Sequence, residues 1–268
     1  MFLHTWHPHP LVATIANIQL HWYGVLLAVA ALAGIGMMEW LGKKYRLDTN
    51  RLFDLALITL VVGFIGARLY HVLNELTYYQ THLSDIFKVW NGGLALHGGI
   101  VAGGAALFFF ARRWKWNPWL IADITVPALA IGQAIGRWGN YFNQELFGKP
   151  TSLPWGIPID LMNRQSPFLT EQFFHPTFLY ESLGLLIITV GLFLMHRRQW
   201  TTKGVKAGTI TLAYIISYSA LRMATEFLRI DRTPIIGGIR LPILVSGLFI
   251  LAAIVILVIR NRHHAKTV

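Results

Sequence analysis

Seven long apolar segments constrain this chain more than any other feature. They cover approximately residues 18–38, 52–72, 94–111, 119–135, 178–195, 208–227 and 241–259. A helix that crosses the hydrocarbon core of a bilayer needs about 20 predominantly apolar residues. The fourth segment is interrupted by Asp123 and Pro127. We therefore expect an all-α polytopic membrane protein with about seven transmembrane helices, forming a single integral membrane domain over residues 1–268.

The composition supports a membrane protein and argues against several other classes. Hydrophobic residues make up 54% of the chain and charged residues only 13%, which is typical of an integral membrane protein. The net charge of +11 does not indicate a nucleic-acid partner, because the basic residues lie between the apolar segments and form no long basic run. The chain has no cysteine, so any thiol chemistry must use a thiol of the substrate.

The distribution of basic residues between the loops predicts the orientation in the membrane. They are concentrated in alternate loops and at the carboxyl end: Lys43, Lys44, Arg46, Arg51, Arg112, Arg113, Lys115, Arg197, Arg198, Lys203, Lys206, Arg260, Arg262 and Lys266. By the positive-inside rule, we expect the amino terminus outside and the carboxyl terminus in the cytoplasm. The amino terminus lacks the basic start and cleavage site of a secretory signal, so we expect it to be retained. Residues 141–176 form the longest outer connection, and their Gly, Pro and Trp content predicts a small ordered periplasmic head between spans four and five.

Three arginines, Arg68, Arg137 and Arg222, lie within or at the end of apolar segments. Arginine at this depth costs at least a few kcal/mol unless it faces a polar cavity or a partner. By the topology above, all three lie toward the outer half of the membrane and could share one basic cavity. Such a cavity fits an enzyme site, and it also fits a lipid or anion transporter.

The sixth segment carries a polar stripe in the sequence YSALRMATEFLR. Its members are Tyr218, Arg222, Glu226 and Arg229, whose spacing of four, four and three residues keeps them on one face of a helix. Arg222 and Glu226 have the i, i+4 spacing of a helical ion pair. The stripe has two explanations: its members satisfy one another between packed helices, or they line a site.

Two further motifs place polar groups next to apolar segments. In GRWGNYFNQELFG, Arg137 and Asn140 lie on one helical face if the helix continues, with Glu145 further on. A guanidinium beside amide groups suits a lipid phosphate, although arginine can also serve as a simple lipid-facing anchor. In NGGLALHGG, the glycines favour close helix packing. For His97, a hydrogen bond between helices and a role in proton transfer are both open.

The motif GRWGNYFNQELFG resembles the signature segment of the bacterial prolipoprotein diacylglyceryl transferases. LHWYG (20–24), NGGLALHGG (91–99), HPTFLYE (175–181) and YSALRMATEFLR resemble other segments of that family in the same order, so the likeness covers nearly the whole chain. One segment departs from the family pattern: GGIRLPILVSG stands where a Gly-Gln pair is expected before the last helix.

The resemblance implies an activity and a set of site residues. It implies transfer of the diacylglyceryl group of phosphatidylglycerol to the lipobox cysteine of a prolipoprotein signal peptide, with release of glycerol 1-phosphate, in the bacterial cytoplasmic membrane. This is the first step of lipoprotein maturation and implies neither a cofactor nor a metal. His97, Arg137 and Arg222 would be catalytic. The residues implied in binding phosphatidylglycerol are Tyr23, Arg137, Asn140, Glu145, Gly148, Tyr218, Arg222, Glu226 and Arg229.

The chemistry of this reaction fits those residue types. A thiol must displace a phosphate ester at a glycerol carbon, and fixed guanidinium groups would stabilise the charge that leaves with the phosphate oxygen. The nucleophile is the substrate thiolate, so the site needs either a base, for which His97 is the candidate, or a positive field that lowers the pKa of the thiol. Another lipid-consuming enzyme, such as a headgroup transferase, would be expected to carry an Asp-rich metal motif, which the sequence lacks.

Overall fold

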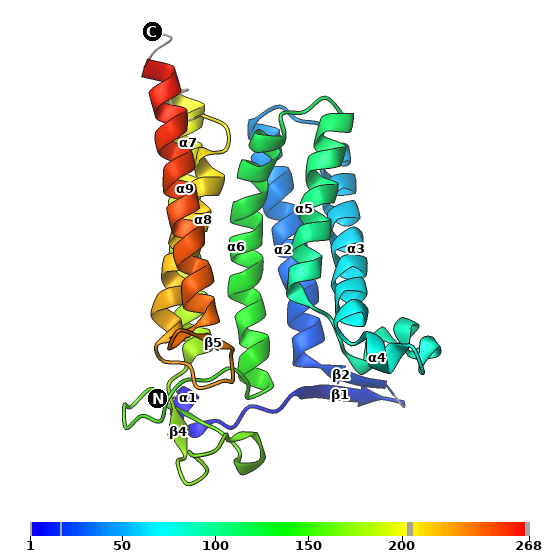
Figure 1. Cartoon of the computed structure of the whole chain (residues 1–268), viewed down its shortest axis with the longest axis vertical. Helices are drawn as coiled ribbons and strands as arrows, with labels where there is room; N and C mark the ends of the chain where they lie inside the picture. Colours follow the sequence, from blue (N-terminus) through cyan, green and yellow to red (C-terminus); the bar gives the residue numbers. More distant parts are fainter. Residues whose placement is uncertain (1, 17, 203–205, 266–268) are drawn as a thin grey trace. The chain divides into compact units, whose positions relative to one another are not determined.

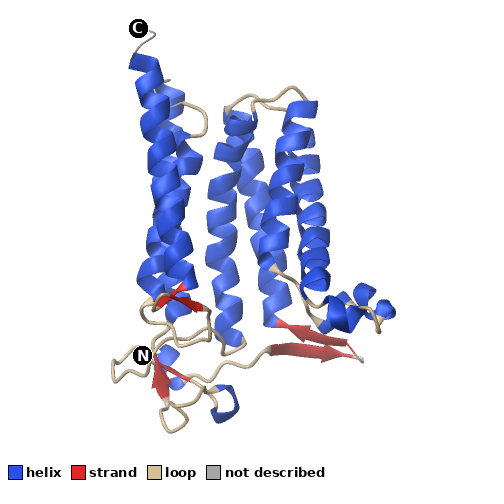
Figure 2. Ribbon diagram, in the orientation of Figure 1, coloured by secondary structure: helices blue, strands red, loops and turns tan. Residues whose placement is uncertain are grey.

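The computed structural model describes residues 2–16, 18–202 and 206–265, and most of them are helical (Figure 1, Figure 2). Lys203 and Lys266, two of the basic residues that predict the membrane orientation, lie outside the described residues. The α-helices are α1 (Phe2–Thr5), α2 (Trp22–Lys44), α3 (Thr49–Asn74), α4 (Leu76–Tyr79), α5 (Leu96–Arg113), α6 (Pro118–Phe142), α7 (Thr177–Thr202), α8 (Thr209–Glu226) and α9 (Leu241–Ala265). Short 3-10 turns cover Leu83–Phe87, Val89–Asn91 and Leu161–Asn163.

The strands are short and form three antiparallel pairs. They are β1 (Leu11–Ile15), β2 (Ile18–His21), β3 (Ile157–Pro158), β4 (Phe173–Phe174), β5 (Ile235–Ile236) and β6 (Ile239–Arg240), paired in sequence order. The chain divides into two compact units, Met1–Gly36 with Val126–Val268, and Met37–Thr125. The unit boundaries fall within α2 and α6, so each of these helices contributes to both units.

Five described helices are long and apolar enough to cross a membrane: α2, α3, α6, α7 and α9. The remaining two predicted spans correspond to α5 and α8, each 18 residues long. Glycines and two terminal arginines dilute the apolar content of α5, and the polar stripe does the same in α8. The protein is therefore an all-α multi-pass membrane protein, and the count of seven spans stays a prediction.

The first predicted span begins later than expected, because its first residues form a β-hairpin. The strand β2 pairs with β1, with Leu11 opposite His21 and Ala13 opposite Leu20. The amide of Trp22 then donates to the carbonyl of Pro10 at 2.9 Å as α2 begins. A short apolar run fits a strand as well as the start of a helix, which explains the difference.

The unit of residues 37–125 is built on α3 and α5, which lie side by side (Figure 1). Asp48 caps α3, because its carboxylate accepts hydrogen bonds from the amides of Asn50 and Arg51. Glycines let the two backbones approach closely: a Cβ on Gly99 would lie 3.3 Å from the carbonyl oxygen of Gly63. This contact bears out the packing role expected for the glycines near His97.

The larger unit contains α7, α8, α9 and the second half of α6. Its core includes Ala130, Leu185, Leu192, Ile210 and Tyr214. Consecutive helices α7, α8 and α9 pack against their neighbours (Figure 1). The end of α7, the start of α8 and the end of α9 lie together, since Lys206 donates to the carbonyl of Arg260 at 3.2 Å. At the opposite end of this group of helices, the end of α8 therefore lies with the starts of α7 and α9.

The connection from α6 to α7 is an ordered region with its own apolar core. Tyr141, Phe147, Ile157, Phe174 and Phe178 are buried together in it. The buried side chain of Gln144 is fully used: its Nε2 donates to the carbonyl of Pro8 at 2.9 Å and to Asp160 Oδ2 at 2.7 Å, and its Oε1 accepts from the Asp160 amide at 2.7 Å. The amino-terminal residues are thus fixed to this region, where the ring of His4 stacks on Phe173.

Candidate active site

The carboxyl end of α6 presents the first site residues. Asn117 caps the start of this helix by accepting from the amide of Trp119, and Pro127 is accommodated inside it. The helix continues to Phe142, so Arg137 and Asn140 lie on one face as predicted. After the helix ends, the chain folds back: the amide of Glu145 donates to the carbonyl of Asn140 at 3.0 Å, and Asn140 Nδ2 donates to Glu145 Oε1 at 2.7 Å.

Glu181 of α7 lies between two arginines. Its Oε2 is 2.5 Å from Arg137 Nε, and its Oε1 accepts from Arg229 Nη1 at 3.4 Å. The side chain of Glu181 is only 4% exposed and that of Arg137 is 19% exposed. A carboxylate buried to this extent needs charged partners to offset its desolvation, and these two guanidinium groups supply them.

Glu226, the last residue of α8, also lies between two arginines. Its Oε2 pairs with Arg222 Nη1, one turn earlier on the same helix. Its Oε1 accepts from Arg240 Nε at 2.7 Å. The side chain of Glu226 is completely buried. The structure therefore confirms the predicted i, i+4 pair and adds Arg240 to it.

Asp231 joins these two halves. Arg229 Nε donates to Asp231 Oδ1 at 2.6 Å, and Arg240 Nη2 donates to the main-chain carbonyl of Asp231 at 2.9 Å. The result is one chain of alternating charges, hereafter the ionic chain: Arg137, Glu181, Arg229, Asp231, Arg240, Glu226 and Arg222. Arg137 and Arg222 form its two ends.

The ionic chain is electrostatically unbalanced. Its four guanidinium groups face three carboxylates, which leaves one positive charge unmatched within it. Burial alone would lower the pKa of Arg229, but its hydrogen bond to Asp231 and the charge of Glu181 raise that pKa above its ordinary value. Among the described residues, protein groups pair with Arg137 only at Nε and with Arg222 only at Nη1. Both end residues thus keep most of their donors for an anion.

A small pocket opens beside the first half of the ionic chain. Arg137, Asn140, Glu181 and Arg229 line its polar side, and Leu146, Thr177 and Phe178 complete the lining. This crevice is too narrow to hold a water molecule, so Arg137 meets these polar and apolar groups in close packing.

Two glycines of the signature segment are required by packing. A Cβ on Gly139 would lie 2.6 Å from Cδ2 of Tyr23, so this glycine lets the exposed Tyr23 ring of α2 approach the helix that carries Arg137. A Cβ on Gly148 would lie 2.8 Å from His175 Cβ and 3.1 Å from the carbonyl oxygen of Leu228. Gly148 also forms an isolated bridge with Arg229, which ties the signature segment to the chain that follows α8.

Tyr218 lies on α8 and stacks on Tyr214, with ring centroids 5.7 Å apart. The hydroxyl of Tyr214 in turn donates to Gln133 Oε1 of α6 at 2.8 Å. Among the described contacts of Tyr218, this stacking is the prominent one, and it places the ring one turn before Arg222. Arg229 lies beyond the end of α8, so the predicted polar stripe is continuous on the helix only as far as Glu226.

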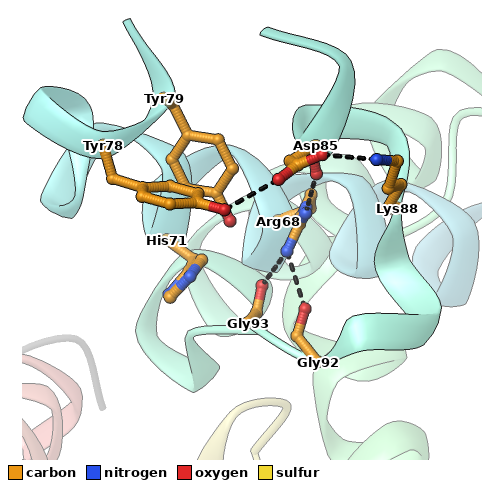
Figure 3. A pocket seen from close by; sticks show the side chains of 8 residues that line it. All are labelled: Arg68, His71, Tyr78, Tyr79, Asp85, Lys88, Gly92 and Gly93. Atoms are coloured by element: carbon orange, nitrogen blue, oxygen red, sulfur yellow. Dashed lines mark hydrogen bonds and ion pairs between the residues drawn. The ribbon is translucent and has the colours of Figure 1, made fainter. Parts of the chain in front are cut away.

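Arg68 has a different environment from the other two intramembrane arginines. It belongs to the unit of residues 37–125, where it is buried and donates to four main-chain carbonyls. Figure 3 shows three of these bonds, to Asp85, Gly92 and Gly93. Nε donates to Ile86 at 2.9 Å, Nη1 to Gly92 at 2.7 Å and Gly93 at 2.9 Å, and Nη2 to Asp85 at 2.5 Å. All three nitrogen atoms are thus used to hold the connection between α3 and α5.

A pocket of about 200 Å³ lies beside Arg68, lined also by His71, Tyr78, Tyr79 and Lys88 (Figure 3). Its charged groups are paired locally: Lys88 Nζ donates to Asp85 Oδ1 at 2.6 Å, and the Tyr78 hydroxyl donates to Asp85 Oδ2 at 2.7 Å. The bonds from Lys88 and Tyr78 lower the pKa of Asp85 to about 2. The hydrogen bond to Asp85 raises the pKa of Tyr78. The charged groups of this pocket therefore stabilise the connection between α3 and α5.

His97 lies in the first turn of α5, in the unit of residues 37–125. Its side chain is exposed, and its ring centroid is 6.3 Å from that of Tyr70. The structure thus gives His97 an accessible imidazole and places it in a different unit from Arg137, Arg222 and the rest of the ionic chain.

Sequence reasoning missed three members of the ionic chain: Glu181, Asp231 and Arg240. Glu181 was visible as the charged residue of the HPTFLYE motif, three residues into an apolar segment. Arg240 lies in the segment that departs from the family pattern, immediately before an apolar helix. Each of these two residues places a charge at the edge of an apolar helix, and other helices end in charges of the opposite sign. This pattern is the signal that could have found both residues.

The membrane-length helices and the buried chain of arginines and carboxylates define a multi-pass membrane protein with a polar site at the end of its helices. The family model for prolipoprotein diacylglyceryl transferase matches residues 10–259. The chain belongs to this family.

Similar proteins carry the same family description. A protein of Synechococcus elongatus is 42% identical over 241 residues, which is 89% of this chain and 83% of the relative. A Synechocystis protein is 40% identical over 242 residues, which is 89% of this chain and 84% of the relative. Another Synechococcus protein is 38% identical over 255 residues, with 91% and 90% covered. All three are named phosphatidylglycerol–prolipoprotein diacylglyceryl transferase.

Proposed function

We propose that this protein transfers the diacylglyceryl group of phosphatidylglycerol to the cysteine thiol of a prolipoprotein. The relatives are named for these two substrates. The single observation that carries the proposal is the state of Arg137 and Arg222: both are anchored by buried carboxylates, and both keep most of their N–H donors free among the described residues. Two oriented guanidinium groups with free donors suit a phosphate.

In the proposed reaction, the thiolate sulfur bonds to a glycerol carbon as the bond between that carbon and the phosphate oxygen breaks. The electron pair leaves with the oxygen, and glycerol 1-phosphate is released. Arg137 and Arg222 stabilise the charge that develops on the phosphate, in a site of low dielectric where fixed donors are most effective. The thiol proton goes to His97 or to solvent, in the latter case because the field of the arginines favours the thiolate.

The other predicted residues have supporting roles in this proposal. Asn140 and Glu145 bond to each other and border the phosphate position, and Tyr23 lies against Gly139 of the same helix. Glu226 orients Arg222, and Arg229 orients Arg137 through Glu181. Tyr218 lies one turn before Arg222 and stacks on Tyr214. Gly148 acts indirectly, by allowing the close approach of the chain that carries Arg229.

The proposal includes a topology. The whole chain forms one domain of seven spans in the bacterial cytoplasmic membrane, with the amino terminus outside, and residues 141–176 form a periplasmic head. Within the larger unit, Arg197, Arg198 and Arg260 lie at the end of the helices opposite the ionic chain. By the positive-inside rule, this end faces the cytoplasm and the site faces the outer leaflet. A lipobox cysteine of a translocated preprotein reaches the site from that side.

A direct test is to incubate the purified protein with phosphatidylglycerol and a peptide that contains a lipobox cysteine. Mass spectrometry should show a diacylglyceryl adduct on the cysteine, and glycerol phosphate should appear in equal amount. A peptide with serine in place of the cysteine is the control. Well-folded protein that binds phosphatidylglycerol but forms no adduct would contradict the proposal and favour a lipid-binding function.

A further inference from the structure

We infer that Glu181 and Arg240 are positioning residues that hold Arg137 and Arg222, the two phosphate-binding arginines, through the ionic chain. This inference rests on the proposed function and deepens it. The predicted site contained neither residue. Neither is placed to bind the phosphate directly, because Glu181 is negative and Arg240 already donates from Nε to Glu226 and from Nη2 to the carbonyl of Asp231.

At one end, Glu181 fixes the direction of Arg137. It engages Nε, the nitrogen nearest the aliphatic stem, and among the described residues no contact engages the two terminal nitrogen atoms. An unanchored arginine would lose side-chain conformational entropy on binding the phosphate. Because Glu181 is held from its other side by Arg229, it cannot follow Arg137 if that side chain swings. The guanidinium is therefore oriented before the lipid arrives.

At the other end, Arg240 fixes Glu226, and Glu226 fixes Arg222. The carboxylate of Glu226 has one oxygen on each arginine. Without Arg240, one oxygen of a completely buried carboxylate would lose its partner, and the carboxylate could take up both of its bonds with Arg222. Arg222 would then have fewer donors for the phosphate. Arg240 prevents this by occupying the second oxygen.

A rigid turn supports Arg240. The strands β5 and β6 form a hairpin whose turn residues, Gly237 and Gly238, have φ values of 58° and 80°. Two successive positive φ values suit a tight turn, and glycine adopts them without strain. The amide of Leu241 then donates to the carbonyl of Pro234 at 2.8 Å. Arg240 is therefore the last residue of a closed hairpin, and α9 begins at the next residue, so its position is set by the backbone.

The first experiment compares Glu181→Gln and Arg240→Gln with matched controls. Glu171→Gln and Arg232→Gln remove the same charges at exposed positions, the first in the loop before α7 and the second beside Asp231. We expect each test variant to lower kcat/KM for phosphatidylglycerol by about tenfold, which lies within the range of coupling energies for residues in one ionic network. The KM for the lipobox peptide should stay unchanged, and both controls should match the wild type.

A double-mutant cycle separates positioning from a general loss of structure. It is run on the affinity for phosphatidylglycerol, measured by lipid titration of protein in a neutral detergent, so it needs no catalytic activity. If Glu181 acts through Arg137, Glu181→Gln weakens binding in the wild-type background but has little further effect when Arg137→Lys is already present. Arg240→Gln and Arg222→Lys should behave in the same way.

Two results would overturn the inference: wild-type affinity in both Glu181→Gln and Arg240→Gln, or fully additive losses in both cycles. The proposed function is judged separately, by adduct formation in the wild type. A wild-type protein that binds phosphatidylglycerol without forming an adduct would contradict the function, and the cycles on lipid affinity would still decide the positioning.

Discussion

Two regions of this protein hold arginines near the ends of apolar helices, and the two regions satisfy these arginines in opposite ways. Arg68 donates from all three nitrogen atoms to carbonyls of its own connection. Arg137 and Arg222 are each held by one carboxylate, through one nitrogen among the described residues. We infer that an intramembrane arginine is a functional candidate when a carboxylate holds its guanidinium group but most of its N–H donors are free. An arginine whose donors are spent on the backbone is a structural element.

The largest effect is expected from Arg222→Ala. Loss of a guanidinium that stabilises the developing phosphate charge should lower kcat/KM for phosphatidylglycerol by about 100-fold or more. Arg222→Lys should also be poor, because an ammonium cannot make a bidentate contact. Initial rates of peptide modification measure both variants, with Arg232→Gln as the control. Activity of Arg222→Ala within a few fold of the wild type would contradict the assignment of Arg222 as a functional arginine.

Arg68→Gln should show the opposite behaviour. Replacing the charged donor at four carbonyls should lower the free energy of unfolding by about 2 to 3 kcal/mol, since hydrogen bonds from charged groups are strong and the carbonyls are left without partners. The kcat of the folded fraction should change little. Thermal unfolding in detergent gives the stability, and the modification assay gives the activity. A stable Arg68→Gln variant with a large loss of kcat would place Arg68 with the functional arginines.

Gly139→Ala should have a smaller effect on the site. The added methyl group would lie 2.6 Å from Tyr23, so the ring or the helix must shift, and such overpacking costs about 1 to 3 kcal/mol. We expect a lower kcat/KM for phosphatidylglycerol with a modest fall in thermal stability. Gly104→Ala is the matched control, because a Cβ there meets nothing within 4 Å. Equal behaviour of the two variants would argue against a close approach of Tyr23 to α6.

The smallest expected effect is a pH dependence in the local stability of residues 83–93, which belong to the connection between α3 and α5. The pKa of Asp85 is lowered to about 2, below its ordinary value of about 4, so its stabilising contribution is present above about pH 4 and is lost as the pH falls toward 2. The pKa of Tyr78 is raised, so its contribution is present at neutral pH and lost only as the pH rises through that raised value. Hydrogen exchange of residues 83–93, corrected for intrinsic rates, should rise in acid. The same rise in Asp85→Asn would contradict this assignment.

The local parts of the site could be predicted from the sequence. The i, i+4 pair of Arg222 and Glu226 and the shared face of Arg137 and Asn140 follow from helical geometry alone. The contact of Glu181 with Arg137 could not be predicted, because it joins residues 44 positions apart on different helices. An apolar helix with no distinct polar face does not reveal which side meets its neighbour, so rotation about the helix axis is not readable from the sequence.

The same limit explains the expectation for Arg68. Sequence shows how deep an arginine lies, but not where its donors point, so Arg68 was grouped with Arg137 and Arg222. The helical segments themselves were predictable from length and apolar content. The β-hairpin before α2 was not, since β2 is a short apolar run that continues into the helix.

The most direct test of the account measures the initial rate of diacylglyceryl adduct formation on a lipobox peptide, at equal amounts of folded protein, for the wild type, Arg137→Ala and Arg68→Gln. We predict an adduct with the wild type, its near-complete loss in Arg137→Ala, and a rate close to the wild type in Arg68→Gln. Equal rates for the wild type and Arg137→Ala would contradict it, because an arginine with free, anchored donors would then have no part in the reaction.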